Sequence, residues 1–292
     1  MGLFRNAAKV WHRTRKRHFG DPPALVPVVR LVGPIGQTGR GGGGITFDAL
    51  AKPLEKAFAH PGVSAVALAI NSPGGTPVQS AMILRHIRDL AEEHEVKVLA
   101  FCEDVAASGG YMLALAGDEI IAHQASLVGS IGVVAGGFGF PEAIAKLGIE
   151  RRVYTAGENK VRLDPFLPEK DSDRAWLGGL QEDIHDLFKT LVRDRRSDKL
   201  DQQAGDLFTG DVWTGGRAVD LGLVDTVGAM YPVLKERYGK KVRIRPVRWR
   251  KSGLLNMLTA DTATHRSERM TAQADAAFAA LEARMMWNRW GL

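Results

Sequence analysis

The sequence predicts an α/β protein, because apolar strands alternate with amphipathic helices through the middle of the chain. Residues 63–71 are almost continuously apolar, as expected of a strand covered on both faces. A helical repeat of apolar residues follows at 77–94, and a second apolar strand at 96–102. This order predicts a parallel strand–helix–strand unit with a right-handed crossover.

Further elements are expected on both sides of this unit. They are a strand at 28–32, a short helix at 109–116, a strand at 119–122, a helix at 141–147, a strand at 150–156 and a helix at 171–195. The helix at 171–195 should bury one apolar stripe, made of Trp176, Leu180, Ile184, Leu187, Phe188 and Leu191. An Ala-rich helix is expected at 268–287.

The composition is that of an ordinary soluble globular protein. The chain has 292 residues, of which 45% are hydrophobic and 25% charged. The single cysteine, Cys102, excludes an internal disulfide framework and a cysteine-rich zinc site. It ends an apolar run, so we interpret it as a small core residue, and we expect no metal or cofactor.

The net charge of +6 comes from two basic segments. Residues 1–20 contain six Lys and Arg and no acid, and residues 240–251 contain seven and no acid. This predicts contact with an anionic surface, such as a membrane. Leu3, Phe4 and Trp11 share one helical face, as in a helix lying in a membrane interface; a frayed basic terminus is the alternative.

Neither a secretory signal nor a transmembrane helix is expected. Residues 1–20 lack the apolar core of a signal peptide. Residues 120–141 carry no Asp, Glu, Lys or Arg, but their glycines and Pro141 indicate buried strand and loop. We therefore expect a cytoplasmic protein that is at most peripheral on the inner face of the cell membrane.

Three glycine-rich turns follow apolar segments, where α/β proteins place their sites. The turn at 71–75 (NSPGG) could donate N–H groups to an oxyanion, or be a plain strand-to-helix turn. The turn at 106–111 (AASGGY) presents Ser108 either as a nucleophile or as a helix N-cap. In the turn at 129–133 (GSIGV), Ser130 is a functional hydroxyl or a satisfied buried serine.

A serine nucleophile needs a base, and Lys160 is the best candidate. The eight histidines lie outside the three turns. His123 is the nearest in sequence, but it ends an apolar strand and is interpreted as a core or edge residue, and His185 is placed at a helix end or on a charged helix face. Lys160 follows the predicted strand at 150–156 and Gly157, so it could point back into a site. It would have to be desolvated to accept a proton. A solvated loop lysine is the alternative, and the residues alone do not decide.

The three turns, together with ENK at 158–160, resemble the signal peptide peptidase SppA family. A further stretch, TGGRAVDLGLVD at 214–225, resembles the segment that closes that domain. The family's members are serine peptidases with a Ser/Lys dyad, on a spiral of β-β-α units shared with ClpP and crotonases. The resemblance implies that Ser108 is the nucleophile, Lys160 its base and Ser130 the hydroxyl that positions the amine. It also implies an oxyanion hole made by the N–H groups of Gly74 and Gly109.

The resemblance covers about residues 26–245 and implies one peptidase domain. A basic N-terminal arm (1–25) would precede it, and a basic and then helical extension (246–292), without a family motif, would follow. Family members form rings or domes in which the lysine can come from a neighbouring protomer, and they cleave signal-peptide remnants and other unfolded, apolar peptides. Short members commonly carry an N-terminal transmembrane helix, which is not evident here.

Two other functions are compatible with the sequence. A non-catalytic oligomeric scaffold at a membrane surface would use the basic segments, and a crotonase-like acyl-CoA enzyme would use the oxyanion turns without a nucleophile. Nucleic-acid binding is not expected, since no aromatic-rich sheet or recognition helix accompanies the basic segments.

Overall fold

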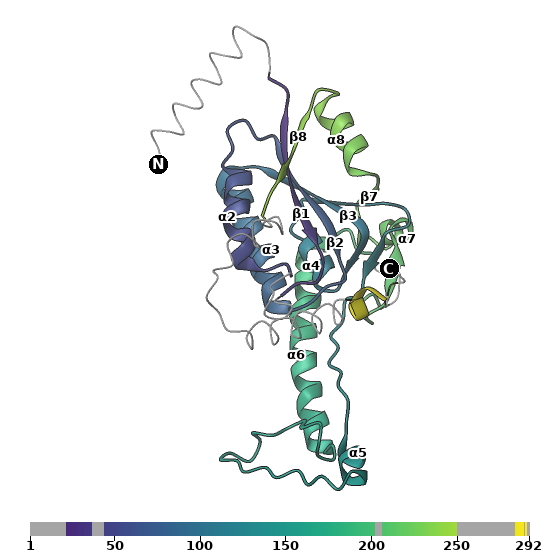
Figure 1. The fold of residues 1–292 in the computed structure, drawn as a ribbon. Coiled ribbons are helices and arrows are strands. Elements are labelled where there is room, and N and C mark those ends of the chain that lie inside the picture. The colour runs from purple at the N-terminus through teal and green to yellow at the C-terminus, as the bar shows by residue number, and fades with distance from the viewer. Residues whose placement is uncertain (1–21, 37–43, 202–205, 250–283, 289, 291–292) are drawn as a thin grey trace, which may run out of the picture.

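One mostly parallel sheet organises the fold (Figure 1). The computed structural model describes residues 22–36, 44–201, 206–249, 284–288 and 290. The strands are β1 (Leu25–Val32), β2 (Ala65–Ser72), β3 (Lys97–Ala107), β4 (Glu119–Ala122), β5 (Leu127–Gly129), β6 (Val212–Thr214), β7 (Thr226–Val227) and β8 (Arg243–Val247). They run in the order β6-β5-β3-β2-β1-β8, and β4 pairs with both β3 and β7. Each of these pairings is parallel except that of β5 with β6, which confirms the α/β class.

Helices cover both faces of the sheet. They are α2 (Phe47–Phe58), α3 (Pro77–His94), α4 (Gly109–Ala114), α5 (Pro141–Lys146), α6 (Asp171–Arg196), α7 (Gly215–Asp220) and α8 (Met230–Tyr238). α2 and α3 pack on one face, where Phe58 and Ile87 are fully buried against Leu68 of β2. α8 covers the other face, where its Leu234 lies in a second apolar cluster with Val26 of β1.

The central β2–α3–β3 unit confirms its prediction. β2 is buried along almost its whole length, as its continuous apolar sequence indicated. α3 has the predicted bounds, with Pro77 in its first turn and a left-handed Glu95 (φ 54°) after its last residue. β3 continues past the predicted end at Cys102 to Ala107 and pairs there with β5. The sheet therefore holds the backbone up to the residue before Ser108.

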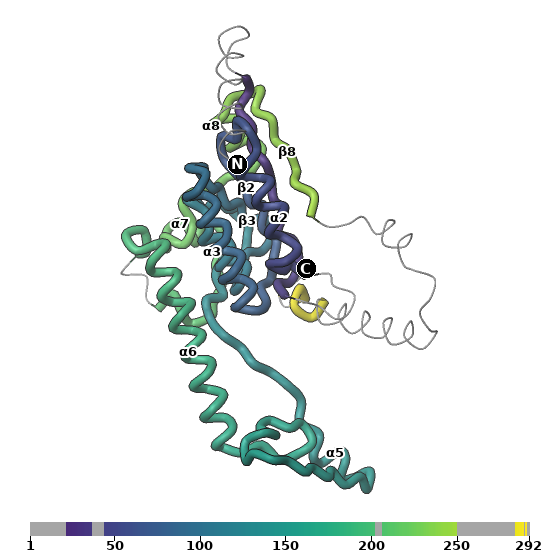
Figure 2. Tube along the Cα trace, turned by 90° about the vertical axis from the view of Figure 1, so that its left-hand side faces the viewer, coloured from purple at the N-terminus to yellow at the C-terminus, as the bar shows by residue number. Residues whose placement is uncertain are grey.

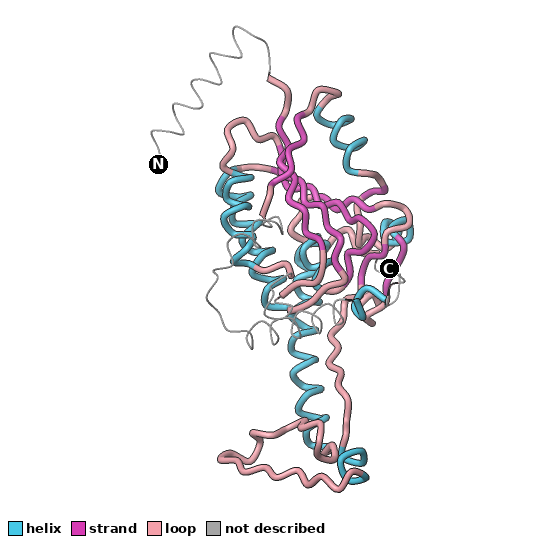
Figure 3. Tube along the Cα trace, viewed as in Figure 1, coloured by secondary structure: helices cyan, strands magenta, loops and turns pink. Residues whose placement is uncertain are grey.

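Residues 133–183, called the projection below, extend away from the sheet (Figures 1 and 2). The projection is mostly loop, with α5 at its tip and the N-terminal half of α6 as its only long helix in the described chain (Figure 3). A small cluster of rings, Phe138, Phe140 and Phe166, holds the tip together. Many of its apolar side chains nevertheless face solvent: Phe138 is 80% and Tyr154 91% exposed.

The strand predicted at 150–156 is wrong. Most of these residues are exposed, and within the described ranges no strand pairs with them. A strand needs a hydrogen-bonded neighbour, which the projection does not offer within one chain.

The stripe predicted to face inward along α6 is only partly buried. Phe188 is 3% exposed, whereas Trp176, Leu180 and Leu187 are 41%, 42% and 72% exposed. Trp176 and Leu180 are exposed because the N-terminal half of α6 belongs to the projection. Leu187 lies in the C-terminal part, which packs on the core through Phe188 and Val192, but its own side chain is exposed.

The glycine-rich segment at 120–141 is not a membrane span. β4 and β5 are buried as predicted, but residues 134–140 are exposed. In the part of the chain that the structure describes, no helix is long and apolar enough to cross a membrane. Residues 1–21 of the predicted basic arm (1–25) and most of the helix predicted at 268–287 lie outside the described residues.

Candidate active site

Ser108 sits in a sharp turn between β3 and α4. Its φ of 53° is a conformation that L-residues adopt at a cost of about 1–3 kcal/mol, and such residues cluster at active sites. The turn is fixed on one side by a 2.8 Å hydrogen bond from the Ser108 N–H to the Gly129 carbonyl. The Ser108 side chain makes no capping hydrogen bond to α4, so the N-cap alternative does not describe it.

The two glycines after Ser108 are required by close packing. A Cβ on Gly109 would lie 2.5 Å from Ser80 Oγ, and one on Gly110 would lie 2.5 Å from the Ser72 carbonyl oxygen. The small residues of the AASGGY turn therefore let α4 approach β2 and α3. The Gly109 N–H is the first of the helix and belongs to the first-turn donors, which have no partner within a helix.

Ser108 opens into a cavity of about 610 Å³ that also contains Ser130. Ser130 is buried and has a φ of 52°, and its N–H donates to the Asp211 carbonyl at 2.6 Å. The structure thus brings together the serines of two of the predicted turns. Polar and apolar surface contribute to the walls in nearly equal parts, and the apolar side chains among them are Pro77, Met112, Val133, Ile184, Phe188 and Trp290.

The first glycine-rich turn lies against Ser108, but its two glycines differ. A Cβ on Gly74 (φ 106°) would lie 2.8 Å from Ser108 Cβ, so the turn lies directly against Ser108. The Gly74 N–H, however, donates to Ser72 Oγ at 3.2 Å. Gly75 lines the cavity, and its nitrogen lies 3.4 Å from the position that a Cβ on Gly109 would take.

Lys160 is not among the residues that line the cavity. It is exposed on the projection, where its N–H donates to the Gly157 carbonyl at 3.2 Å. Within one chain, the structure therefore does not bring Lys160 to Ser108. The expected return of the lysine from a strand fails because residues 150–156 form no strand.

Several cavity residues were missed by sequence reasoning. His185, placed on a charged helix face, lines the cavity and its Nε2 lies 3.1 Å from the Ile131 carbonyl oxygen. Met286 and Trp290 reach the cavity from the C-terminal segment, which has no recognisable motif. Gly75 could have been selected from the sequence, because it is the second glycine of a pair that follows a strand.

Other reactive groups take no part in this cavity. Cys102 is buried as predicted, and burial raises the pKa of its thiol to about 12. In the described ranges, no group of three or more His, Cys, Asp and Glu side chains is placed to hold a metal ion.

Residues 91–242, which carry Ser108, Ser130 and Lys160, match the family model described as Peptidase family S49. The chain belongs to peptidase family S49. This S49 chain is 31% identical over 207 residues to "Serine protease SPPA, chloroplastic" of Arabidopsis thaliana, a match that covers 70% of this chain and 29% of that protein.

A second relative carries a different name. The chain is 48% identical over 282 residues to "Na(+)/H(+) antiporter NhaA" of Brucella melitensis, covering 94% of this chain and 38% of that protein. The S49 chain thus spans less than two fifths of either relative, and the antiporter name describes a protein most of which has no counterpart here.

Among solved structures, the chain is similar to a mutant of the "1510-N membrane-bound stomatin-specific protease". The TM-score is 0.48 and the identity 13%, covering 78% of this chain and 99% of that one. A likeness of this size supports no argument about function.

Proposed function

We propose that this S49 protein is a serine endopeptidase in which Ser108 is acylated by the substrate. The observation that carries the proposal is the strained turn that presents Ser108, without a capping role, to a cavity shared with Ser130. Strained backbone persists only where the surroundings enforce it, and a nucleophile on a sharp turn is a recurring reason for it. We also infer that the sheet and its helices are the ClpP-like spiral of β-β-α units.

The chemistry needs a base and an oxyanion hole. Ser108 Oγ attacks the peptide carbonyl while its proton passes to the Lys160 amine, which then protonates the departing amine. Water hydrolyses the acyl-enzyme and frees the hydroxyl. Ser130 Oγ orients the lysine, and the oxyanion is bound by the N–H of Gly109 and one from the 74–75 turn. Gly75, which faces the cavity, is the better donor, because the N–H of Gly74 is engaged by Ser72.

Lys160 is supplied by a neighbouring copy of the chain. The projection carries it away from its own body and exposes Val134, Phe138, Leu147 and Tyr154 at 74–91%. Apolar side chains exposed together in this way are typical of protein–protein interfaces. A head-to-tail contact that closes on itself produces a ring, so we propose a homo-oligomeric ring or dome.

The apolar side chains in the cavity wall, among them Met112, Phe188 and Trp290, favour unfolded, apolar peptides as substrates, such as signal-peptide remnants or membrane-protein fragments. Peripheral contact with anionic lipid, on the inner face of the cell membrane, would bring the enzyme to them. Lys240, Lys241, Arg243, Arg245 and Arg248 lie along and beside β8, at the edge of the sheet. Clustered cations of this kind bind anionic leaflets in a salt-sensitive way.

A mixing experiment tests this function. Ser108→Ala and Lys160→Ala chains should each be inactive on an unfolded apolar peptide. After denaturation and co-refolding, about a quarter of the sites should pair an intact serine with a neighbour's lysine, as heterologous contacts require. A mixture that stays inactive contradicts the shared site. Lys160→Arg, which keeps the charge but cannot act as a base, should also be inactive.

A further inference from the structure

Helix α4 needs support from outside itself. It has six residues and begins with two glycines, so it is too short to be stable alone. Ser108 depends on it, because the strained turn is held on its upstream side by β3 and on its downstream side only by α4. The Gly109 N–H, a proposed oxyanion donor, is part of the same helix. Whatever fixes α4 therefore fixes both the nucleophile and the group that stabilises the transition state.

The middle of α4 is held by Tyr111, three residues after Ser108. Its side chain is fully buried, and its hydroxyl donates to the Leu223 carbonyl at 2.8 Å. Burial raises the pKa of the Tyr111 phenol, with smaller effects from the charges nearby, so the hydroxyl remains a donor at any working pH. This hydrogen bond ties α4 to a segment more than a hundred residues further along the chain.

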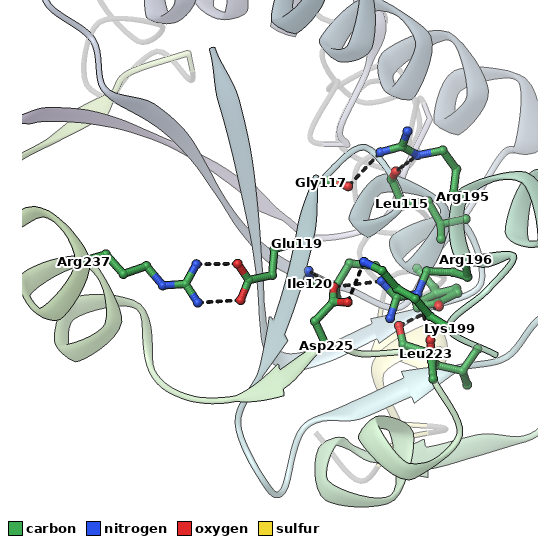
Figure 4. Close-up of polar contacts among 12 residues, drawn as sticks. Leu115, Gly117, Glu119, Ile120, Arg195, Arg196, Lys199, Leu223, Asp225 and Arg237 are labelled. Carbon is green, nitrogen blue, oxygen red and sulfur yellow. Dashed lines mark hydrogen bonds and ion pairs between the residues drawn. The ribbon is translucent and has the colours of Figure 1, made fainter. Parts of the chain in front are cut away.

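The end of α4 is held by Arg195, from the C-terminal turn of α6. Its Nε donates to the Leu115 carbonyl at 2.8 Å and its Nη2 to the Gly117 carbonyl at 2.9 Å (Figure 4). Leu115 is the C-cap of α4, and Gly117 lies in the loop after it. Carbonyls at the C-terminal end of a helix lack hydrogen-bond partners within the helix, and a cation is favourable there. One guanidinium thus clamps two carbonyl groups just beyond α4.

Both attachments lead to the same end of α6. Arg196 donates from Nε to the Gly222 carbonyl and from Nη1 to Asp225, each at 2.8 Å, and so holds the segment that receives the Tyr111 hydroxyl. Figure 4 shows the two arginines side by side, one directed to the loop after α4 and the other to the Leu223 segment. The other end of α6 belongs to the projection that carries Lys160.

We propose that Tyr111 and Arg195 are positioning residues, which hold α4 so that Ser108 Oγ and the Gly109 N–H keep their reactive geometry. The proposal rests on the proposed role of Ser108. Most of the cavity wall comes from outside α4, which contributes Gly109 and Met112, so substrate binding depends mainly on other elements. Oxyanion stabilisation, in contrast, depends on where α4 lies. Displacing α4 should therefore lower kcat and leave KM nearly unchanged, which a role in stability alone does not predict.

The test compares two variants of the full-length assembly with two matched controls. Tyr111→Phe removes only the hydroxyl, and Arg195→Gln removes the clamp. Tyr238→Phe removes a phenol hydroxyl on the far side of the sheet, and Arg237→Gln removes a guanidinium that pairs with Glu119 (Figure 4). For each, kcat and KM on an apolar peptide, the rate of Ser108 labelling by a fluorophosphonate and the melting temperature are measured.

We expect kcat and the labelling rate to fall together by about tenfold or more in Tyr111→Phe and Arg195→Gln, with KM within about twofold of wild type. Tyr238→Phe and Arg237→Gln should keep the wild-type kcat and labelling rate, even if their melting temperatures fall as much as those of Tyr111→Phe and Arg195→Gln. Arg195→Lys, which keeps one donor, should recover part of the loss. If both variants label Ser108 at the wild-type rate well below their melting temperatures, the positioning role is overturned. If wild-type Ser108 is not labelled at all, the proposed function fails instead. Should Tyr111→Phe not fold, the two Arg195 variants alone decide the outcome.

Discussion

Asp225 forms an ion pair with the buried Arg196. The loss of stability that follows its replacement by asparagine can be worked out from the structure. Its carboxylate accepts hydrogen bonds from Arg196 Nη1, Lys199 Nζ and the Ile120 N–H, at 2.8, 2.8 and 2.7 Å (Figure 4). Arg196 is only 3% exposed, so its charge depends on Asp225 for compensation. One of its nitrogens, Nη2, already lacks a hydrogen-bond partner among the described residues.

The magnitude follows from the burial of Arg196. Removing one partner of a buried ion pair costs about 3–5 kcal/mol, because the other charge is left uncompensated. We take the lower end, about 3 kcal/mol, because an asparagine oxygen still accepts one hydrogen bond and the Asp225 side chain is itself partly exposed. At neutral pH the melting temperature of Asp225→Asn should fall by about 6–12 °C.

The pH dependence separates the charge from the shape of this side chain. Partial burial alone would raise the pKa of Asp225, but hydrogen bonds from Arg196, Lys199 and Ile120 outweigh it and hold that pKa below its usual value. Stability from a lowered carboxyl pKa is fully present above the unfolded value, about 3.9, and is lost as the pH falls through the folded one. The gap between wild type and Asp225→Asn should therefore be constant from about pH 5 to 8 and should narrow below about pH 4.

Denaturant unfolding, followed by circular dichroism at each pH, measures that gap. Asp220→Asn is the matched control, because Asp220 pairs with Arg217 at 3.4 Å on the surface, where an ion pair contributes less than about 1 kcal/mol. A loss at pH 7 no larger than that of the control would refute the reasoning. So would a gap that stays the same size at pH 3, since the charge would then not be its source.

Three further predictions concern the site and the assembly. Gly74→Ala would place a Cβ 2.8 Å from Ser108 Cβ at a φ of 106°, so kcat on a peptide substrate should fall at least about tenfold. A wild-type kcat would show that the turn does not press on Ser108. Trp290→Ala should remove about 1 kcal/mol of apolar contact from the cavity wall and raise KM for apolar peptides about fivefold in steady-state assays, whereas an unchanged KM would place Trp290 outside the substrate's path. Phe138→Asp, at a side chain that is 80% exposed on the projection, should shift light scattering towards monomer and lower activity at dilute concentration. Tyr231→Asp on α8, also exposed, is its control, and equal behaviour of the two would count against an interface on the projection.

The sequence predicted those helices and strands whose apolar residues are buried within the same chain. α3 and β4 have the predicted bounds. The helical apolar repeat of α3 is buried against the sheet, and the short apolar run of β4 is buried within it. The pattern fails in the projection. Trp176 and Leu180 continue the apolar stripe of α6, but periodicity indicates only that a face is to be covered, and not by what. In one chain, the Arg162 guanidinium lies over the Trp176 ring, yet Trp176 and Leu180 both remain more than 40% exposed, which is consistent with a second copy as the missing partner.

In the candidate site, residues with a local sequence pattern could likewise be predicted, and residues placed by tertiary packing could not. Ser108 and Ser130 could be selected because glycines beside a hydroxyl at the end of a strand are a local signal, and the structure places both in one cavity. His185 and Trp290 carry no local signal, since they reach the cavity through the packing of α6 and the C-terminal segment. Lys160 was selected by resemblance, and its proposed contact with Ser108 lies between chains, where neither the sequence nor one chain's fold can place it.

The central claim is that Ser108 is the nucleophile, and intact-mass analysis of the assembled protein after treatment with a fluorophosphonate tests it most directly. We predict one adduct per chain, which maps to Ser108, is absent from Ser108→Ala and forms much more slowly on Lys160→Arg. An adduct that maps to another serine, or a Ser108→Ala protein that still hydrolyses peptide at the wild-type rate, would contradict the account.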